Sequence, residues 1–118
     1  MFPPGFAVGV RCFNAGEFFE AHEAFEELLD QVEGDDRWDL LLALIQVAVG
    51  YHKCVHEHPG GARMLGLGAE KLVPFPPVAR GVDVAALRRR VADDLAVLEA
   101  GGSLAARLAA TPPRLEMA

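Results

Sequence analysis

The chain has 118 residues, of which 52% are hydrophobic and 24% charged, and its formal net charge at pH 7 is −6. This length and composition fit one folded domain, residues 1–118, that buries roughly two-thirds of the surface its unfolded chain exposes. Nine of the seventeen acidic residues lie between Glu17 and Asp36, a stretch without lysine or arginine. Because such a surface repels phosphate groups and anionic lipids, we expect no nucleic-acid partner and no membrane partner.

The first residues provide neither the basic start nor the apolar run of a secretory signal. The longest apolar run, Leu40 to Val49, is interrupted by Gln46 and is too short to cross a bilayer. The two cysteines, Cys12 and Cys54, are too few for a disulfide framework. We therefore expect a cytoplasmic protein with reduced thiols.

Hydrophobic residues recur with helical spacing along most of the chain, and no segment alternates with a period of two. We therefore predict an all-α fold without strands. The expected helices span about Pro3–Gly16, Glu17–Val32, Arg37–Glu57, Ala62–Leu72, Asp83–Ala100 and Leu104–Ala110. Because short turns join most of them, we expect a single compact antiparallel bundle of five to six helices, with a motif region at about 10–72 and C-terminal helices at about 84–110.

Start and stop residues define several of these helices. Gly16 can take the left-handed conformation that ends a helix. The residues that can cap later helices are Asp35, Asp36 and Asp83. The helix Arg37–Glu57 is apolar nearly all round between Leu40 and Val49, which is typical of a helix at the centre of a domain. Trp38, at its start, is expected to fill the core.

Features near the C-terminus are less regular. Arg90 and Asp94 are expected to form an i, i+4 ion pair on the exposed side of their helix. The proline-rich segment 73–82 is predicted to be a loop or bend. The residues that follow Pro113 are expected to form a loose tail.

A histidine and two glutamates form an H-E-x-x-E pattern at the border between the apolar and polar faces of the second predicted helix. They are His22, Glu23 and Glu26. The zinc-protease pattern H-E-x-x-H uses two histidines four residues apart as ligands and the glutamate as a base. Here a glutamate replaces the second histidine, and carboxylates also bind zinc. The spacing is compatible with His22 and Glu26 as metal ligands and Glu23 as a catalytic base.

A metal site needs further ligands from a second helix, and the central helix offers them. His52 and His56 are four residues apart, and His58 follows near the helix end. We expect His52 to face the site and the other two histidines to be exposed. Gln46, the only polar residue between Leu40 and Val49, needs a hydrogen-bond partner for its amide.

A structural interpretation of the same residues is equally open. His22 can bond a glutamate of its own helix, and Gln46 can bond a backbone group or Asn14. Asn14 stands next to a helix end, where its side chain can bond local backbone. In this interpretation the polar residues hold helices together and carry no chemistry.

The run F-N-x-G-x-x-F-E-A-H-E-x-x-E, from Phe13 to Glu26, resembles the signature of a bacterial and archaeal domain family of unknown function, DUF309. The segment from Gln46 to His52 and the pair Gly61-Ala62 resemble the second block of that family, so the likeness covers about Val10 to Leu72. The resemblance implies a small all-helical fold. It also implies a shared polar site of Asn14, Glu20, His22, Glu23, Glu26, Gln46 and His52.

Three functions remain open at this point. We favour a structural or protein-interaction module that binds a protein partner or a second copy, because the chain has a surplus of apolar residues. The alternative is a metal-dependent hydrolase, a label that similar proteins sometimes receive. In it His22, Glu26 and His52 would bind a divalent metal such as zinc, and Glu23 would take a proton from metal-bound water. The third is a small-ligand pocket without metal, built from the same residues.

Overall fold

The computed structural model describes all 118 residues. Its elements in chain order are α1 (Phe6–Asn14), α2 (Phe18–Glu26), a 3-10 helix η1 (Leu29–Gln31), α3 (Asp36–Val55), α4 (Gly61–Leu72), β1 (Val78–Ala79), β2 (Val82–Asp83), α5 (Val84–Glu99) and α6 (Ala105–Ala110). The predicted all-α bundle is confirmed. The expectation of no strands is wrong for the antiparallel hairpin β1–β2, which has two residues in each strand and lies in the proline-rich segment.

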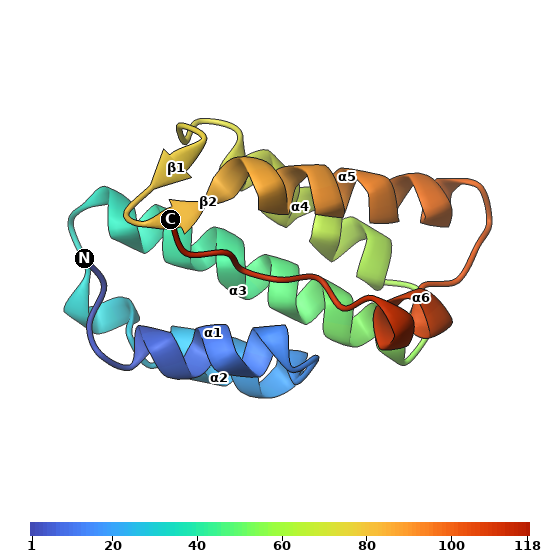
Figure 1. The fold of residues 1–118 in the computed structure, drawn as a ribbon, viewed down its shortest axis with the longest axis horizontal. Coiled ribbons are helices and arrows are strands. Elements are labelled where there is room, and N and C mark those ends of the chain that lie inside the picture. The colour runs from blue at the N-terminus through green and yellow to red at the C-terminus, as the bar shows by residue number, and fades with distance from the viewer.

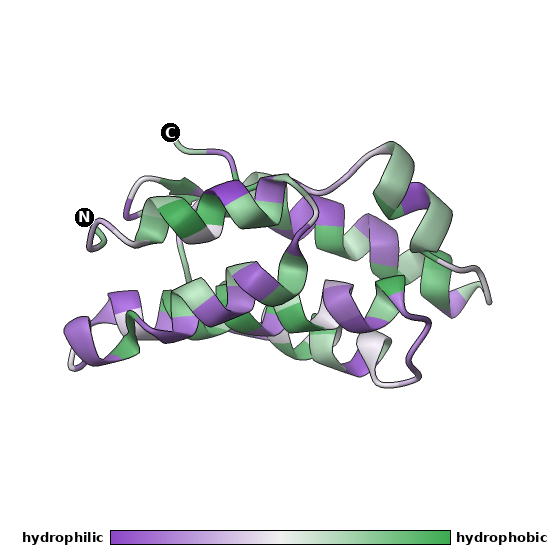
Figure 2. Cartoon of the chain, turned by 90° about the horizontal axis from the view of Figure 1, so that it is seen from below, coloured by the Kyte–Doolittle hydropathy of each residue, from purple (hydrophilic) through white to green (hydrophobic).

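The helices are arranged around α3. The pair α1 and α2 packs along one side of α3, and α4 packs along the other with α5 against it (Figure 1). After α6 the chain runs back along the molecule and ends beside the hairpin. Hydrophilic and hydrophobic residues alternate along the helices (Figure 2), which is the pattern of amphipathic helices around a core. The buried apolar residues form one cluster of 27 side chains.

The central position predicted for α3 is confirmed, since half of its twenty residues are buried. Its predicted cap is also present, because a carboxylate oxygen of Asp35 accepts the backbone N–H of Arg37 at 2.8 Å. By length and composition α3 could cross a membrane, but 56% of its most apolar window is buried against other helices, as in core helices generally. The prediction for Trp38 is wrong: it is 37% exposed, because it precedes the covered part of α3.

Glycines bring α3 and α4 close together. A Cβ atom on Gly50 would lie 2.8 Å from the backbone nitrogen of Leu65, and one on Gly68 would lie 3.0 Å from the backbone nitrogen of Val47. Because backbone atoms cannot move aside as a side-chain tip can, any larger residue here would push the two helices apart. This contact holds α4 on the side of α3 opposite to α2.

The turn before α2 has the predicted geometry, but α2 is shorter than predicted. Gly16 has a φ of 80°, and the backbone N–H of Glu17 donates to the carbonyl of Cys12 at 2.9 Å, which is the Schellman arrangement that ends a helix. We predicted that α2 continues to Val32, whereas it ends at Glu26 and is followed by η1. A 3-10 turn after an α-helix is common. The side chain of Val32, which follows η1, is buried, as expected for a residue on the apolar face.

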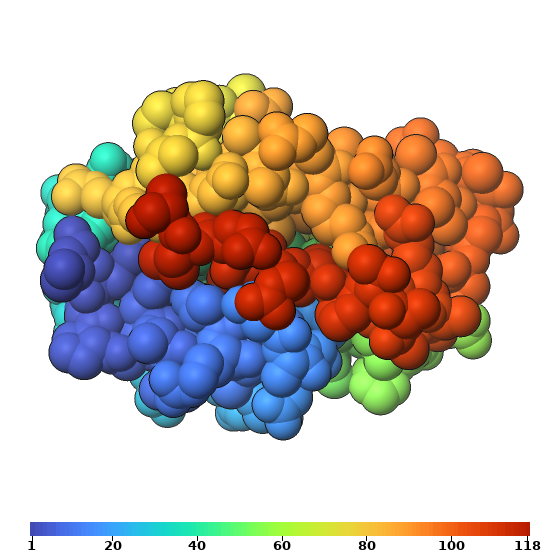
Figure 3. All heavy atoms as spheres, in the orientation of Figure 1, coloured from blue at the N-terminus to red at the C-terminus, as the bar shows by residue number.

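The C-terminal residues 111–118, which we call the strap, are ordered by many contacts, so the expectation of a loose tail is wrong. The strap fills the seam between α1 and α5 (Figure 3). The side chains of Pro113 and Leu115 are buried, whereas Arg114 and Glu116 are exposed. Met117 pairs with Val82 in an antiparallel β-bridge. The burial of these two side chains and the bridge to Val82 explain why the strap is held on the bundle.

The carboxylate of Asp94 is fully buried, which corrects the prediction of an exposed ion pair with Arg90. It accepts hydrogen bonds from the Tyr51 hydroxyl at 2.6 Å, from Arg90 Nε at 2.8 Å and from Arg107 Nε at 2.6 Å. The donors belong to α3, α5 and α6. A helical wheel of α5 alone cannot show this burial, because the partners Tyr51 and Arg107 come from α3 and α6.

Removal of the Asp94 carboxylate is expected to destabilise the fold strongly. Asp94→Ala should lower the free energy of unfolding by about 3 kcal/mol, because it leaves the Tyr51 hydroxyl and two guanidinium groups without their partner. The matched change at the exposed neighbour, Asp93→Ala, should alter it by less than about 0.5 kcal/mol. Urea unfolding followed by circular dichroism measures both. Equal effects of the two changes would contradict the structural role assigned to Asp94.

Candidate functional site

All four histidines of the chain line one surface pocket of about 450 Å³. The lining residues are Phe19, His22, Val49, His52, Lys53, His56 and His58. They come from α2, from α3 and from the turn that follows α3. No carboxylate is among them, although the chain has a net charge of −6.

Helical spacing explains why these side chains meet. Phe19 and His22 are three residues apart on α2, and their rings lie 5.4 Å apart between centroids. His52 near the end of α3 and His56 directly after it are four residues apart, with ring centroids at 4.7 Å. Residues three and four apart share one side of a helix. Phe19 joins the two helices, since its ring centroid also lies 5.4 Å from that of His52.

His22 is held within its own helix, as the structural interpretation predicted. Its Nε2 lies 2.8 Å from a carboxylate oxygen of Glu26, and its Nδ1 lies 3.2 Å from the backbone oxygen of Phe19. Both ring nitrogens therefore already have a partner on α2. The Glu26 carboxylate, 58% exposed, is engaged with His22 and does not line the pocket.

His52 is different, because its ring makes no hydrogen bond and packs between Phe19 and His56. Its pKa is lowered, first by the loss of hydration on partial burial and then by the neighbouring His56. Glu20 acts in the opposite direction, and His22 and Lys53 lower the pKa further. The His52 imidazole is thus kept in its neutral form at pH 7.

The remaining residues of the predicted polar site do not share the pocket. Glu20 and Glu23 are exposed on α2 and do not line it. The oxygen Oε1 of Gln46 is buried without a hydrogen-bond partner, so its predicted bond to Asn14 or to a backbone group is not formed through this atom.

Asn14 binds the strap instead of local backbone. Its Nδ2 donates to the carbonyl of Leu115 at 3.3 Å, and its Oδ1 accepts the backbone N–H of the same residue at 2.7 Å. These partners are 101 positions apart in the chain. Nothing in the local sequence indicates such a bond, since a helix-end asparagine usually bonds nearby backbone.

The arrangement does not assemble the predicted metal ligands. No group of three or more His, Cys, Asp and Glu side chains is placed to hold a metal ion together. His22 and His52 line the same pocket, as the hypothesis requires, but Glu26 and Glu23 lie outside it. The assignment of His22, Glu26 and His52 as ligands and of Glu23 as a base stays a prediction.

Sequence reasoning missed most of the pocket lining. Phe19, Val49 and Lys53 were not singled out, and His56 and His58 were expected only to be exposed. The i, i+4 spacing of His52 and His56 was the available signal. The contribution of Phe19 depends on how closely α2 packs on α3, which the sequence of α2 alone does not specify.

The fold and the pocket together define a class: a small, mainly helical protein with a histidine-lined surface pocket. Its C-terminal strap does not line this pocket and packs against α1 instead. Residues 6–65, just over half of the chain, match the family model described as Domain of unknown function (DUF309). The chain belongs to the DUF309 family, which confirms the resemblance seen in its motifs. No curated protein matches it.

The titration of His52 tests the electrostatics of the pocket. His56→Gln should raise the pKa of His52 because it removes a neighbouring ring that becomes positively charged, whereas Glu20→Gln should lower it further. Because the folded state binds this proton less tightly than the unfolded state, the contribution of His52 to stability should fall as the pH drops below about 6.5. NMR titration of the imidazole resonances measures each value. An unchanged His52 in the His56→Gln variant would show that the two rings are not coupled.

Proposed function

We propose that this protein is a cytoplasmic protein-interaction module that docks an acidic segment of a partner protein in the histidine pocket. The observation that carries the proposal is the pocket lining: four histidines and a lysine surround it, without a carboxylate, in an otherwise acidic chain. A partner that presents a carboxylate next to an apolar residue fits this chemistry.

The apolar part of the surface supports docking of a protein. Phe19 is 44% exposed at the pocket, and Val49 lines it as well. Aromatic side chains at the centre of a contact commonly supply much of its binding free energy, and polar groups around them set the orientation. His56 and His58 are exposed there, so their rings can reach a bound group.

Charge determines the expected pH dependence of docking. In the free protein His52 is kept neutral because its pKa is lowered. A docked carboxylate favours the charged imidazole and therefore raises that pKa. By linkage the partner must bind more tightly as the pH falls from about 8 to about 6, since protonation and carboxylate binding favour each other.

Site-specific photo-crosslinking tests the proposal in the full chain. With p-benzoylphenylalanine in place of Phe19, crosslinks should map to an acidic segment of one partner, and their yield should be higher at pH 6 than at pH 8. Lys53→Glu should lower the yield about five-fold or more, because it places a negative charge at the pocket. The matched control carries the same probe at Val73, which is 57% exposed at the end of α4.

Two outcomes would contradict the proposal. One is an equal set of crosslinks from positions 19 and 73. The other is a yield at position 19 that neither pH nor Lys53→Glu changes. Either result would show that the probe reports accidental contacts.

The metal-dependent hydrolase is the second candidate, favoured only by the shared pocket of His22 and His52. Elemental analysis of untagged protein and melting curves with zinc, manganese and nickel test it. The hydrolase predicts a stoichiometric metal or a rise in melting temperature that His52→Gln removes. Metal-free protein with unchanged melting would exclude it.

A further inference from the structure

We propose that the seam between α1 and α5 is a peptide-binding groove that accepts the strap of a second copy of this chain as well as its own. The strap lies in this groove (Figure 3), where its backbone groups bond Asn14 of α1 and the hairpin β1–β2. The inference does not rest on the histidine pocket, because no strap residue lines it.

The first contact is a two-way clamp on the strap backbone. The Asn14 side chain donates to the Leu115 carbonyl and accepts the Leu115 N–H, at 3.3 and 2.7 Å. One amide thus satisfies both polar groups of a single residue in an extended chain. Because Asn14 bonds only backbone atoms, the same two bonds can form with a segment of this chain or of a second copy.

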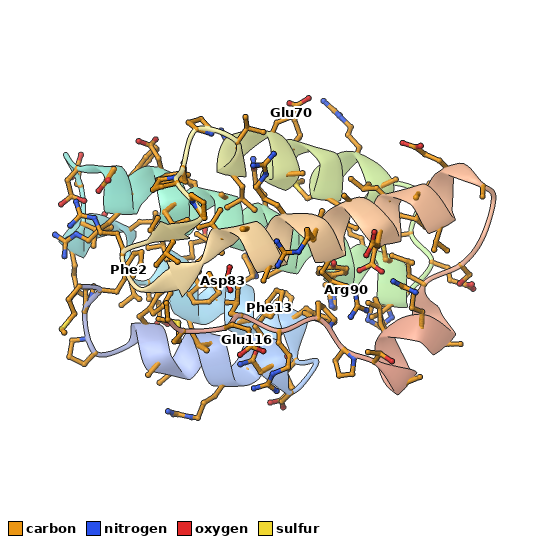
Figure 4. The ribbon with its side chains drawn as sticks, turned by 45° about the horizontal axis from the view of Figure 1, so that its top comes forward. Phe2, Phe13, Glu70, Asp83, Arg90 and Glu116 are labelled. Atoms are coloured by element: carbon orange, nitrogen blue, oxygen red, sulfur yellow. The ribbon has the colours of Figure 1, made fainter.

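The second contact is strand addition to the hairpin. The backbone N–H of Asp83 donates to the Glu116 carbonyl at 2.9 Å, and the N–H of Ala118 donates to the Gly81 carbonyl at 2.8 Å. Asp83 and Glu116 lie next to each other where the strap meets β2 (Figure 4). Addition of an extended segment to an exposed strand edge is a general mode of peptide binding between chains.

The third contact gives selectivity for this particular segment. Leu115 is 2% exposed, and Pro113 is also buried, while the intervening Arg114 points outward. Alternate side chains of an extended peptide therefore enter the protein, and the spacing proline-x-leucine is what the groove recognises. At the start of the strap, Arg90 of α5 donates to the carbonyl of Thr111.

A second copy is the occupant to which the groove is best matched, because its strap has the same sequence. The linker between α5 and α6 contains Gly101, with a φ of 84°, and Gly102, so the C-terminal segment is joined to the bundle through a glycine turn. Exchange of the segment between two copies preserves every contact named above and costs the entropy of association. A shorter linker that prevents the strap from reaching its own groove should favour exchange.

A peptide with the strap sequence, TPPRLEMA, tests the groove directly. The receptor is the full chain with Pro113→Ala and Leu115→Ala, which weakens its own strap and leaves the groove intact. Fluorescence anisotropy should show saturable binding of the labelled peptide. Adding Asn14→Ala to the receptor should weaken binding about ten-fold or more, as should the same two alanine changes in the peptide. Circular dichroism confirms that each receptor is folded.

Deletion of Gly101 and Gly102 tests the second copy. The shortened chain should sediment as a dimer at concentrations where the native chain is a monomer, and Asn14→Ala should reduce the dimer fraction because the exchanged strap is held by the same clamp. A folded monomer would overturn the exchange between copies. If the shortened chain does not fold, the peptide measurement decides: a folded receptor that binds no peptide, or binds it independently of Asn14, would overturn the groove itself.

Discussion

The buried carboxylate of Asp94 is the constraint on which the C-terminal half of the structure depends. A charge removed from water costs several kcal/mol unless it is paired and fully hydrogen-bonded. Here three donors satisfy it, the Tyr51 hydroxyl of α3, Arg90 of α5 and Arg107 of α6. Such a network adds little net stability over apolar packing, but another position of α6 would leave the Oδ1 atom of Asp94 without its Arg107 donor. Asp94 therefore specifies where α6 lies.

The network also holds elements next to the two surfaces described above. The position of α6 sets the start of the strap, where Arg90 also bonds the Thr111 carbonyl. On α3, the bond from Tyr51 to Asp94 adds to the buried apolar face in holding the side of the helix that carries Tyr51 toward the core. His52 is the next residue, about 100° further round, and this places its ring at the border between the core and α2. The pocket thus lies beside the part of α3 that Tyr51 anchors in the core.

The sequence predicted what local spacing determines. The apolar stretch of α3 indicated the central helix, Gly16 and Asp35 marked helix ends, and the H-E-x-x-E spacing indicated that His22 can bond Glu26. It could not predict contacts that join distant segments. The bond between Asn14 and Leu115 spans 101 positions, and Asp94 has partners in α3 and α6. A single amphipathic wheel treats both residues as solvent-facing, because each is covered by an element from elsewhere in the chain.

The family signature can be understood as serving two surfaces and a core rather than one catalytic site. Within the run from Phe13 to Glu26, Asn14 holds the strap on one face, whereas His22 lines the pocket. Phe13 and Phe18 are buried, with ring centroids 5.3 Å apart, and they fix α1 against α2 between these two positions. A mechanism that requires Asn14 and His22 to act on one substrate must therefore move one of them. In the structure each of the two already has a partner within the chain, Leu115 for Asn14 and Glu26 for His22, and the aromatic contact lies between them.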